Sequence, residues 1–228
     1  MLRREEGRTV PRILAVADEV DESLGGEALG QLRPDLVLSA GDLPFDYLEY
    51  LVTVLNVPLL YVPGNHDPSL RSRRGELAWP PSIELKDARD PVVPLGGTTV
   101  DGRIEDVAGI RVAGLGGSVR YREGPNQYTQ KEMLRRARRL RRRAAARGLR
   151  GRRGVDVLLT HAPPLGVGDE DDPAHQGFEA LVQLVGRLSP KLLVHGHIHP
   201  YGQAKPDRQL GTTTVVNAVP FRLLEVEP

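Results

Sequence analysis

The chain has 228 residues and a formal net charge of +1 at pH 7, because 31 lysines and arginines nearly balance 30 acidic residues. Such a balance gives no overall field that attracts nucleic acid or an anionic membrane. Cysteine is absent, which excludes disulfides, thiolate metal ligands and cysteine nucleophiles. The sequence has no apolar run of ~18 residues and no signal-peptide pattern, so we expect a cytoplasmic protein that does not enter a membrane.

Short apolar segments that end in polar residues alternate with helical spacing in the first third of the chain. Residues 12–18 (RILAVAD) and 35–42 (DLVLSAGD) each predict a buried strand that ends at an acid. Residues 45–56 have helical spacing, and residues 57–67 (VPLLYVPGNHD) predict a strand that runs into a Pro-Gly turn. The order strand, helix, strand is typical of parallel βαβ units.

The remaining segments predict further strands and helices. Residues 92–118 alternate polar and apolar positions between glycines, which predicts hairpin strands, and residues 130–147 predict a strongly charged helix. Further on we expect a strand at 155–164 (VDVLLTHAPP), a helix at 177–188, a strand at 191–200 (KLLVHGHIHP) and two strands within 212–227. Because no linker or repeat interrupts this pattern, we expect one α/β domain over residues 1–228.

Five of the predicted strands end in Asp, Asn or His side chains. These side chains are Asp18, Asp42, Asn65 with His66, His161, and His197 with His199. A single Asp after a strand is usually a turn or helix-capping residue, but five such endings together indicate a ligand site at the carboxyl ends of the strands. Asp, Asn and His without Cys suit a divalent metal such as Mn²⁺, Fe²⁺ or Zn²⁺.

Three of the six histidines stand at alternate positions, 195, 197 and 199. In an extended strand these side chains would point to the same face. His197 and His199 could then reach the same ligand site. For His195 we favour a packed strand residue, with a supporting role beside that site as the alternative.

Four motifs occur in the order GDLPFD (41–46), GNHD (64–67), THAPP (160–164) and GHIHP (196–200). Together they resemble the calcineurin-like metallophosphoesterase superfamily, whose pattern is D-x-H, G-D, G-N-H-D/E, H and G-H-x-H. The resemblance spans residues 13–200. It implies a four-layer αββα sandwich of two mixed β-sheets flanked by helices. It also implies hydrolysis of a phosphomonoester or phosphodiester by a dinuclear metal centre with a bridging hydroxide, on a small phosphorylated substrate or nucleotide.

The same resemblance implies a role for each motif residue. Asp42 bridges two divalent metals, with Asp18 and His199 on the first and Asn65, His161 and His197 on the second. His66 binds no metal and faces the phosphate as a general acid or as a stabiliser of the leaving group. Asp46 or Asp67 could orient His66, as carboxylates orient catalytic imidazoles. His175, before a predicted helix, either lies near the phosphate or is a solvated loop residue.

The first motif departs from the family pattern, since D-x-H is replaced by Asp18, Glu19 and Val20. The first metal therefore lacks an imidazole, and we predict a weak or partly occupied first site. Glu19 would point away if the strand continued, although a loop could turn it or Asp21 inward. The departure leaves an alternative open: a metal- or ligand-binding protein with little turnover on a degenerate phosphoesterase scaffold.

Two further segments have no motif. Residues 131–153 contain one lysine and eleven arginines with almost no aromatic residues. We expect a solvated or self-associating helix there, and we do not expect nucleic acid as a partner. The loop at 122–129 (REGPNQYT) could cover the metal site and shape the substrate pocket.

Overall fold

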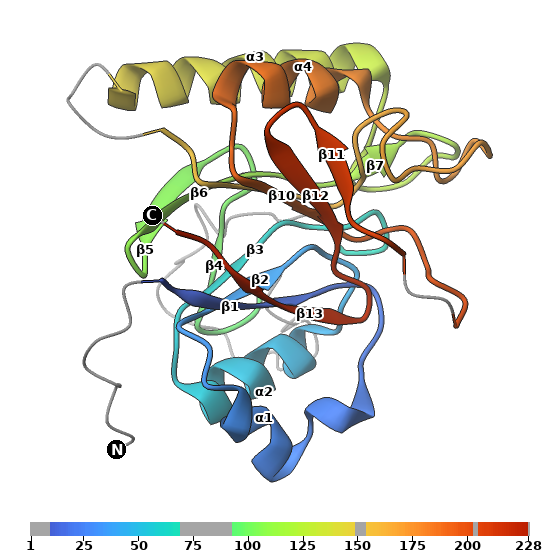
Figure 1. Ribbon diagram of the computed structural model, residues 1–228. Coiled ribbons are helices and arrows are strands. Elements are labelled where there is room, and N and C mark those ends of the chain that lie inside the picture. Colours follow the sequence, from blue (N-terminus) through green and yellow to red (C-terminus); the bar gives the residue numbers. More distant parts are fainter. Residues whose placement is uncertain (1–9, 69–92, 149–153, 203–204, 228) are drawn as a thin grey trace, which may run out of the picture.

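Two mixed β-sheets face each other and carry helices on their outer faces, as the computed structural model shows (Figure 1). The structure describes residues 10–68, 93–148, 154–202 and 205–227. The first sheet has the spatial order β13 (Phe221–Glu225), β1 (Arg12–Val16), β2 (Leu36–Ser39), β3 (Leu59–Tyr61) and β4 (Gly97–Thr99). Strands β1 to β4 are parallel, and β13 is antiparallel to β1.

The second sheet combines parallel central strands with antiparallel edges. Its order is β11 (Arg208–Leu210), β12 (Thr213–Asn217), β10 (Leu192–His195), β9 (Val157–Thr160), β6 (Ile110–Leu115) and β5 (Ile104–Val107). The four inner strands are parallel, and β11 and β5 are antiparallel to their neighbours. Two short strands, β7 (Ser118–Val119) and β8 (Gln127–Tyr128), pair apart from both sheets.

Helices cover the outer face of each sheet, so the predicted αββα sandwich is confirmed (Figure 1). The first sheet carries η1 (Glu22–Leu24), α1 (Gly26–Leu32) and α2 (Phe45–Leu55), and the second carries α3 (Gln130–Gly148) and α4 (Glu179–Leu188). Side chains of the inner strands alternate between layers. In β1, Ile13 and Ala15 pack between the sheets, whereas Leu14 and Val16 pack toward the helices.

The predicted hairpin region divides between the two sheets. Strands β5 and β6 form the antiparallel hairpin that the glycine-punctuated pattern predicts. Strand β4 instead pairs with β3 in the first sheet, so the prediction of hairpin strands throughout 92–118 was wrong for this part, and residue 92 lies outside the described residues. Alternating polarity marks a strand but does not identify its partner.

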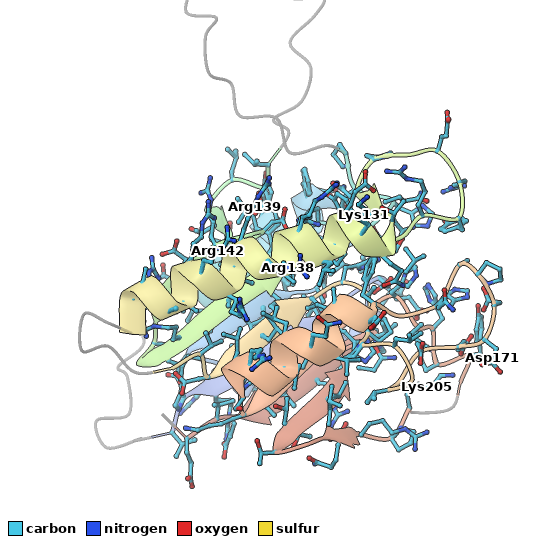
Figure 2. All side chains as sticks on the ribbon, turned by 90° about the horizontal axis from the view of Figure 1, so that it is seen from above. Lys131, Arg138, Arg139, Arg142, Asp171 and Lys205 are labelled. Carbon is cyan, nitrogen blue, oxygen red and sulfur yellow. The ribbon has the colours of Figure 1, made fainter. Side chains whose placement is uncertain are left out.

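The arginine-rich helix α3 lies on the outside of the second sheet beside α4 (Figure 2). It begins with a capping box, in which Thr129 and Glu132 bond each other's backbone amides. Its buried residues are Met133, Ala137 and Leu140, while Arg138 and Arg142 are exposed. The helix is thus solvated on one face as predicted, residues 149–153 lie outside the described residues, and self-association stays a prediction. Of the helices that the structure describes, none could cross a membrane.

Candidate metal centre

The six predicted metal ligands lie directly after five strands, three in the first sheet and two in the second. Asp18, Asp42 and Asn65 follow β1, β2 and β3, His161 follows β9, and His197 and His199 follow β10. Ligand atoms of Asp18, His161 and His197 lie within 4.8 Å of one another. The carboxyl ends of strands from both sheets therefore meet at one site, which is where α/β folds bind ligands.

His161 is the fully buried centre of this group. Its Nδ1 lies 2.8 Å from the carbonyl oxygen of Ala40, which can only accept, so Nδ1 carries a hydrogen. Its Nε2 lies 2.9 Å from Asn65 Oδ1 and 3.3 Å from Asp42 Oδ2. A neutral ring would place a lone pair against these two acceptor oxygens. A proton or a metal ion at this point would satisfy both oxygens, and these residues fit a metal.

The pKa shifts of these groups also indicate a site that favours positive charge. Burial opposes the charged form of His161, but Asp42 and Asp18 outweigh it and raise the pKa to about 9. Burial would also raise the pKa of Asp42, yet the charge of His161 and hydrogen bonds from the ring and from the His66 amide lower it to about 2. For Asp18, burial dominates and raises the pKa to about 6. A cation among these groups would stabilise both carboxylates in their charged form.

Sharp turns place two of the ligands. Asp18 and His197 both have a left-handed backbone, with φ of 60° and 69°. In each case the next residue donates its amide to the preceding residue's carbonyl, over 2.6 Å and 2.8 Å, as in a strained γ-turn. The His197 amide donates to Asp18 Oδ2 over 2.8 Å, which joins the two turns.

The predicted strand at 191–200 was wrong beyond His195, where β10 ends. The turn at His197 breaks the alternation, so the three histidines do not share one face. His197 lies beside His161, with ring centroids 4.8 Å apart, and its Nε2 donates to Ala174 O over 2.7 Å, which leaves Nδ1 for a metal. His195 Nδ1 instead donates to Gly196 O over 2.8 Å, and its ring lines a separate cavity of about 370 Å³.

In the degenerate first motif, Glu19 contacts His199, a predicted ligand outside the group of Asp18, His161 and His197. The turn at Asp18 directs Glu19 so that its Oε1 accepts a hydrogen bond from His199 Nδ1 over 2.6 Å. Val20 is 47% exposed and offers no ligand atom. Asp21 caps η1 by accepting the Ser23 amide. Of the two acids that a loop could turn inward, it is Glu19 that contacts a predicted metal ligand.

His66 is exposed beside the buried group, and an arginine rather than a carboxylate contacts its ring. Arg122 Nη2 lies 3.4 Å from His66 Nδ1. Because a guanidinium only donates, Nδ1 accepts, and in the neutral ring the proton lies on Nε2. Asp67 instead accepts the backbone amides of Asp42 and Gly64, over 3.0 Å and 2.8 Å, and Asp46 accepts the Tyr47 amide over 2.9 Å.

The loop at 120–129 lies over the GNHD segment. Asn126 Nδ2 donates to the carbonyl oxygens of Gly64 and Asp67, over 2.9 Å and 3.0 Å. Asn65 Nδ2 lies 3.4 Å from the Tyr121 hydroxyl, so this loop also contacts a predicted ligand. The expectation that the loop adjoins the metal site agrees with these contacts.

Comparison with known proteins identifies the family. Residues 11–201 match the model of the calcineurin-like phosphoesterase family. The chain belongs to this family. It is 44% identical over 68 residues to metallophosphoesterase domain-containing protein 1 of Homo sapiens, a match that covers 28% of this chain and 20% of that protein. It is 52% identical over 48 residues to a UPF0046 protein of Caenorhabditis elegans, which covers 20% of this chain and 12% of that protein.

Solved structures share the fold of this calcineurin-like phosphoesterase at low sequence identity. The protein TT1561 of Thermus thermophilus is 19% identical, with a TM-score of 0.51 over 92% of this chain and 89% of that chain. Another solved chain is 16% identical, with a TM-score of 0.59 over 95% of both chains. The chain thus spans most of these structures but only about a fifth of the human relative's length.

Three residues that contact the candidate site were not among the predicted site residues: Tyr121, Arg122 and Asn126. Their loop carried a signal, because Gly-Pro-Asn punctuation between two tyrosines marks a defined turn. Gln127 Oε1 accepts the backbone amides of Tyr121 and Arg122 over 3.4 Å and 3.3 Å, which holds the backbone of both residues in place. Spacing alone did not show that the loop returns to residues 64–67.

His175 lies close to His197. Its ring centroid is 5.3 Å from that of His197, and its Nδ1 is 2.8 Å from Asp172 Oδ2. A position of His175 near the phosphate, one of the two interpretations that the sequence left open, stays a prediction.

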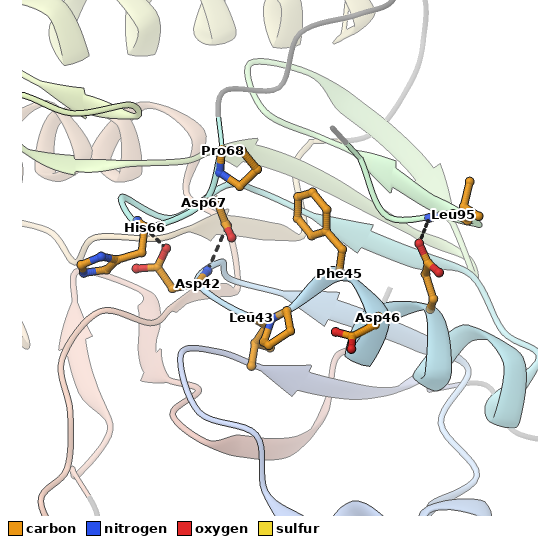
Figure 3. A pocket seen from close by; sticks show the side chains of 10 residues that line it. Asp42, Leu43, Phe45, Asp46, His66, Asp67, Pro68 and Leu95 are labelled. Atoms are coloured by element: carbon orange, nitrogen blue, oxygen red, sulfur yellow. Dashed lines mark hydrogen bonds between the residues drawn. The ribbon is translucent and has the colours of Figure 1, made fainter. Parts of the chain in front are cut away.

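A cavity of about 730 Å³ opens beside Asp42 and His66 (Figure 3). Its lining combines apolar residues with carboxylates: Asp42, Leu43, Pro44, Phe45, Asp46, Glu49, His66, Asp67, Pro68 and Leu95. Asp42 and Asp67 are held by backbone amides of this segment, whereas Asp46 lies exposed at the start of α2. The cavity therefore offers apolar contact and negative charge next to the metal centre.

Proposed function

We propose that the protein is a metal-dependent phosphoric ester hydrolase that acts on a small phosphorylated substrate or nucleotide. The observation that carries this proposal is the position of His161 Nε2 between Asn65 Oδ1 and Asp42 Oδ2, with Asp18 and His197 within reach of the same point. Family membership supports the reaction class. The residues with roles in the proposal come from both sheets, so the fold itself assembles the site.

The proposed metal ligands are Asp18, Asp42 and His199 for a first ion, and Asp42, Asn65, His161 and His197 for a second. Nitrogen and oxygen donors suit Mn²⁺, Fe²⁺ or Zn²⁺. When bound, two such ions supply Lewis acidity that activates water and neutralises charge on the phosphoryl oxygens. His161 and His197 each donate the N–H of one ring nitrogen to a backbone carbonyl. With a metal bound, the other ring nitrogen of each would offer its lone pair to the ion.

His66 is the proposed general acid. Its backbone amide donates to Asp42 Oδ1 over 2.8 Å, so the residue is fixed to a ligand while its side chain is exposed. In the neutral ring the contact with Arg122 leaves the hydrogen on Nε2. We propose that the imidazolium form of His66 gives its Nε2 proton to the oxygen of the leaving alcohol and returns to the neutral ring. The alcohol would lie in the cavity at Phe45 and Asp46.

The carboxylates of this cavity limit which leaving groups it can hold. Asp46 and Glu49 would repel a leaving group that carries further phosphates. We therefore expect an alcohol that is uncharged or cationic. Phe45 and Leu95 offer it apolar contact.

The test is a hydrolysis assay of protein loaded with Mn²⁺ or Zn²⁺, with metal-free protein as the control. The substrates are an alkyl phosphomonoester, its phosphodiester, nitrophenyl esters of both kinds, and a nucleoside diphosphate. We expect metal-dependent turnover of at least one ester and slower turnover of the diphosphate.

The second candidate is a metal- or ligand-binding protein with little turnover. Val20, in the place of the family's imidazole, favours it. Protein that binds two ions and hydrolyses none of these esters would decide for this candidate.

A further inference from the structure

The first metal site of this chain lacks an imidazole and has an added carboxylate. Val20 is exposed and cannot bind a metal, while the neighbouring Glu19 contacts His199, a predicted ligand of that site. From the sequence, Glu19 would point away on a continued strand, or a loop could turn it inward. The left-handed turn at Asp18, with φ of 60°, changes the direction of the chain after β1 and places the Glu19 carboxylate beside His199.

The Glu19–His199 contact determines which ring nitrogen of His199 can bind a metal. Oε1 of Glu19 is 2.6 Å from His199 Nδ1, and a carboxylate can only accept, so Nδ1 carries the hydrogen. The lone pair is then on Nε2. A carboxylate on the far nitrogen orients a ligating histidine and makes it more basic, and loss of such a partner typically lowers metal affinity about 10–100-fold.

We propose that Glu19 compensates for the missing imidazole by holding His199 with Nε2 as the ligand of the first metal. Glu19 is a positioning residue in this proposal, since it acts through His199. Its charge also lies near the site, where it offsets in part the loss of a ligand. The proposal rests on the metal binding proposed above, but not on turnover.

The experiment is a calorimetric titration of Mn²⁺ into metal-free full-length protein at fixed pH. It compares wild type with Glu19→Ala and Glu19→Gln, and the matched control is Glu22→Ala, an exposed acid in η1. We expect one tight and one weaker binding event in wild type. Glu19→Ala should weaken the weaker event about 10–100-fold and leave the tight event unchanged. Glu19→Gln should lose less, because its amide oxygen still accepts from Nδ1, and Glu22→Ala should match wild type.

Several results would overturn the proposal. They are a single binding event in wild type, an unchanged weaker event in Glu19→Ala, and equal weakening of both events. A fall in the thermal unfolding midpoint of the metal-free Glu19→Ala protein, with both affinities unchanged, would assign Glu19 a merely structural role. Wild type that binds two ions as expected but hydrolyses no ester would contradict the proposed function and leave this proposal standing.

Discussion

Gly196 lies so close to Asp18 that a Cβ on the glycine would be 2.3 Å from the Asp18 Oδ2 atom. The same oxygen accepts the amide of His197, the next residue. The glycine of GHIHP thus allows the end of β10 to approach the end of β1 closely. Gly64 has the same relation to Asp42, since its Cβ would be 2.0 Å from Asp42 Oδ1.

Gly196→Ala should disrupt the metal site. The added methyl group must displace the Asp18 carboxylate or the turn at His197, and overpacking of this kind typically costs about 1–3 kcal/mol. We expect a lower free energy of unfolding in urea and loss of the weaker Mn²⁺ event. The control is Gly186→Ala in α4, where a Cβ meets nothing within 4 Å and should add about 0.5–1 kcal/mol of stability. Wild-type stability and metal binding in Gly196→Ala would contradict this interpretation.

Metal binding should release a proton from His161. Its pKa of about 9 keeps the metal-free ring charged at pH 7, and a metal requires the neutral ring. Mn²⁺ affinity at the second site should therefore rise about tenfold per pH unit from pH 7 toward pH 9 and then level off. Calorimetry in two buffers of different ionisation enthalpy at pH 7.5 should report about one proton released at this site. Flat affinity over this range would refute it.

The same pKa shifts act on the stability of the metal-free protein. Because the pKa of His161 is raised from 6.5 to about 9, its contribution is complete below pH 6.5 and is lost as the pH rises through about 9. The pKa of Asp42 is lowered from 3.8 to about 2, so its contribution is present above pH 3.8 and is lost as the pH falls through about 2. The pKa of Asp18 is raised from 3.8 to about 6, so Asp18 lowers the stability of the folded protein. This loss of stability grows as the pH rises from 3.8 and is complete above about 6, where the buried carboxylate is charged.

His66→Ala should separate binding from chemistry. We expect wild-type metal content, since His66 is exposed and is not a proposed ligand. Turnover of an alkyl phosphate should fall about 10²–10⁴-fold, the usual contribution of a general acid. Turnover of a nitrophenyl ester should fall less, because that leaving group needs no proton. Equal losses on both substrates at equal metal loading would remove the role assigned to Nε2.

Arg122→Ala should lower kcat/KM for the alkyl phosphate about 10–100-fold. We expect the exposed guanidinium beside His66 to donate to a phosphoryl oxygen, and hydrogen bonds to charged groups contribute about 1.5–3 kcal/mol. Part of the loss acts through His66, which Arg122 contacts. The double variant with His66→Ala should therefore lose less than the product of the two single losses. Strictly multiplicative losses in this double-mutant cycle would show that the two residues act independently.

Much of the fold was predictable because local pattern and tertiary role agree. Apolar runs that end in polar residues predicted the central strands of both sheets and the strand ends at which the site lies. The charged helical pattern predicted α3. The pattern could not show that β4 joins the first sheet, because sheet partners depend on contacts distant in sequence. It also could not show the turn at His197, since positive φ at a histidine is held by tertiary contacts such as the bond to Asp18.

The site residues likewise include some that were predictable from the sequence and some that were not. Motif residues were identifiable from their order, whereas Arg122, Asn126 and the inward position of Glu19 depend on turns that bring distant segments together. Asp46 or Asp67 could have oriented His66, but Asp67 accepts backbone amides of the motif loops and Asp46 accepts the Tyr47 amide. A carboxylate can serve either purpose, and only the direction of the chain decides between them.

Anomalous X-ray diffraction from crystals grown with Mn²⁺ would show whether two metal ions lie among these strand ends. We predict two peaks that share Asp42, the stronger also bound by Asn65, His161 and His197 and the weaker by Asp18 and His199. A second group of possible ligands, Glu170, Asp172 and His175, also lies within 4.8 Å of one another, although Glu170 is paired with Lys205 at 2.9 Å. Peaks at that group alone, or no peak beside Asp42, would contradict the account.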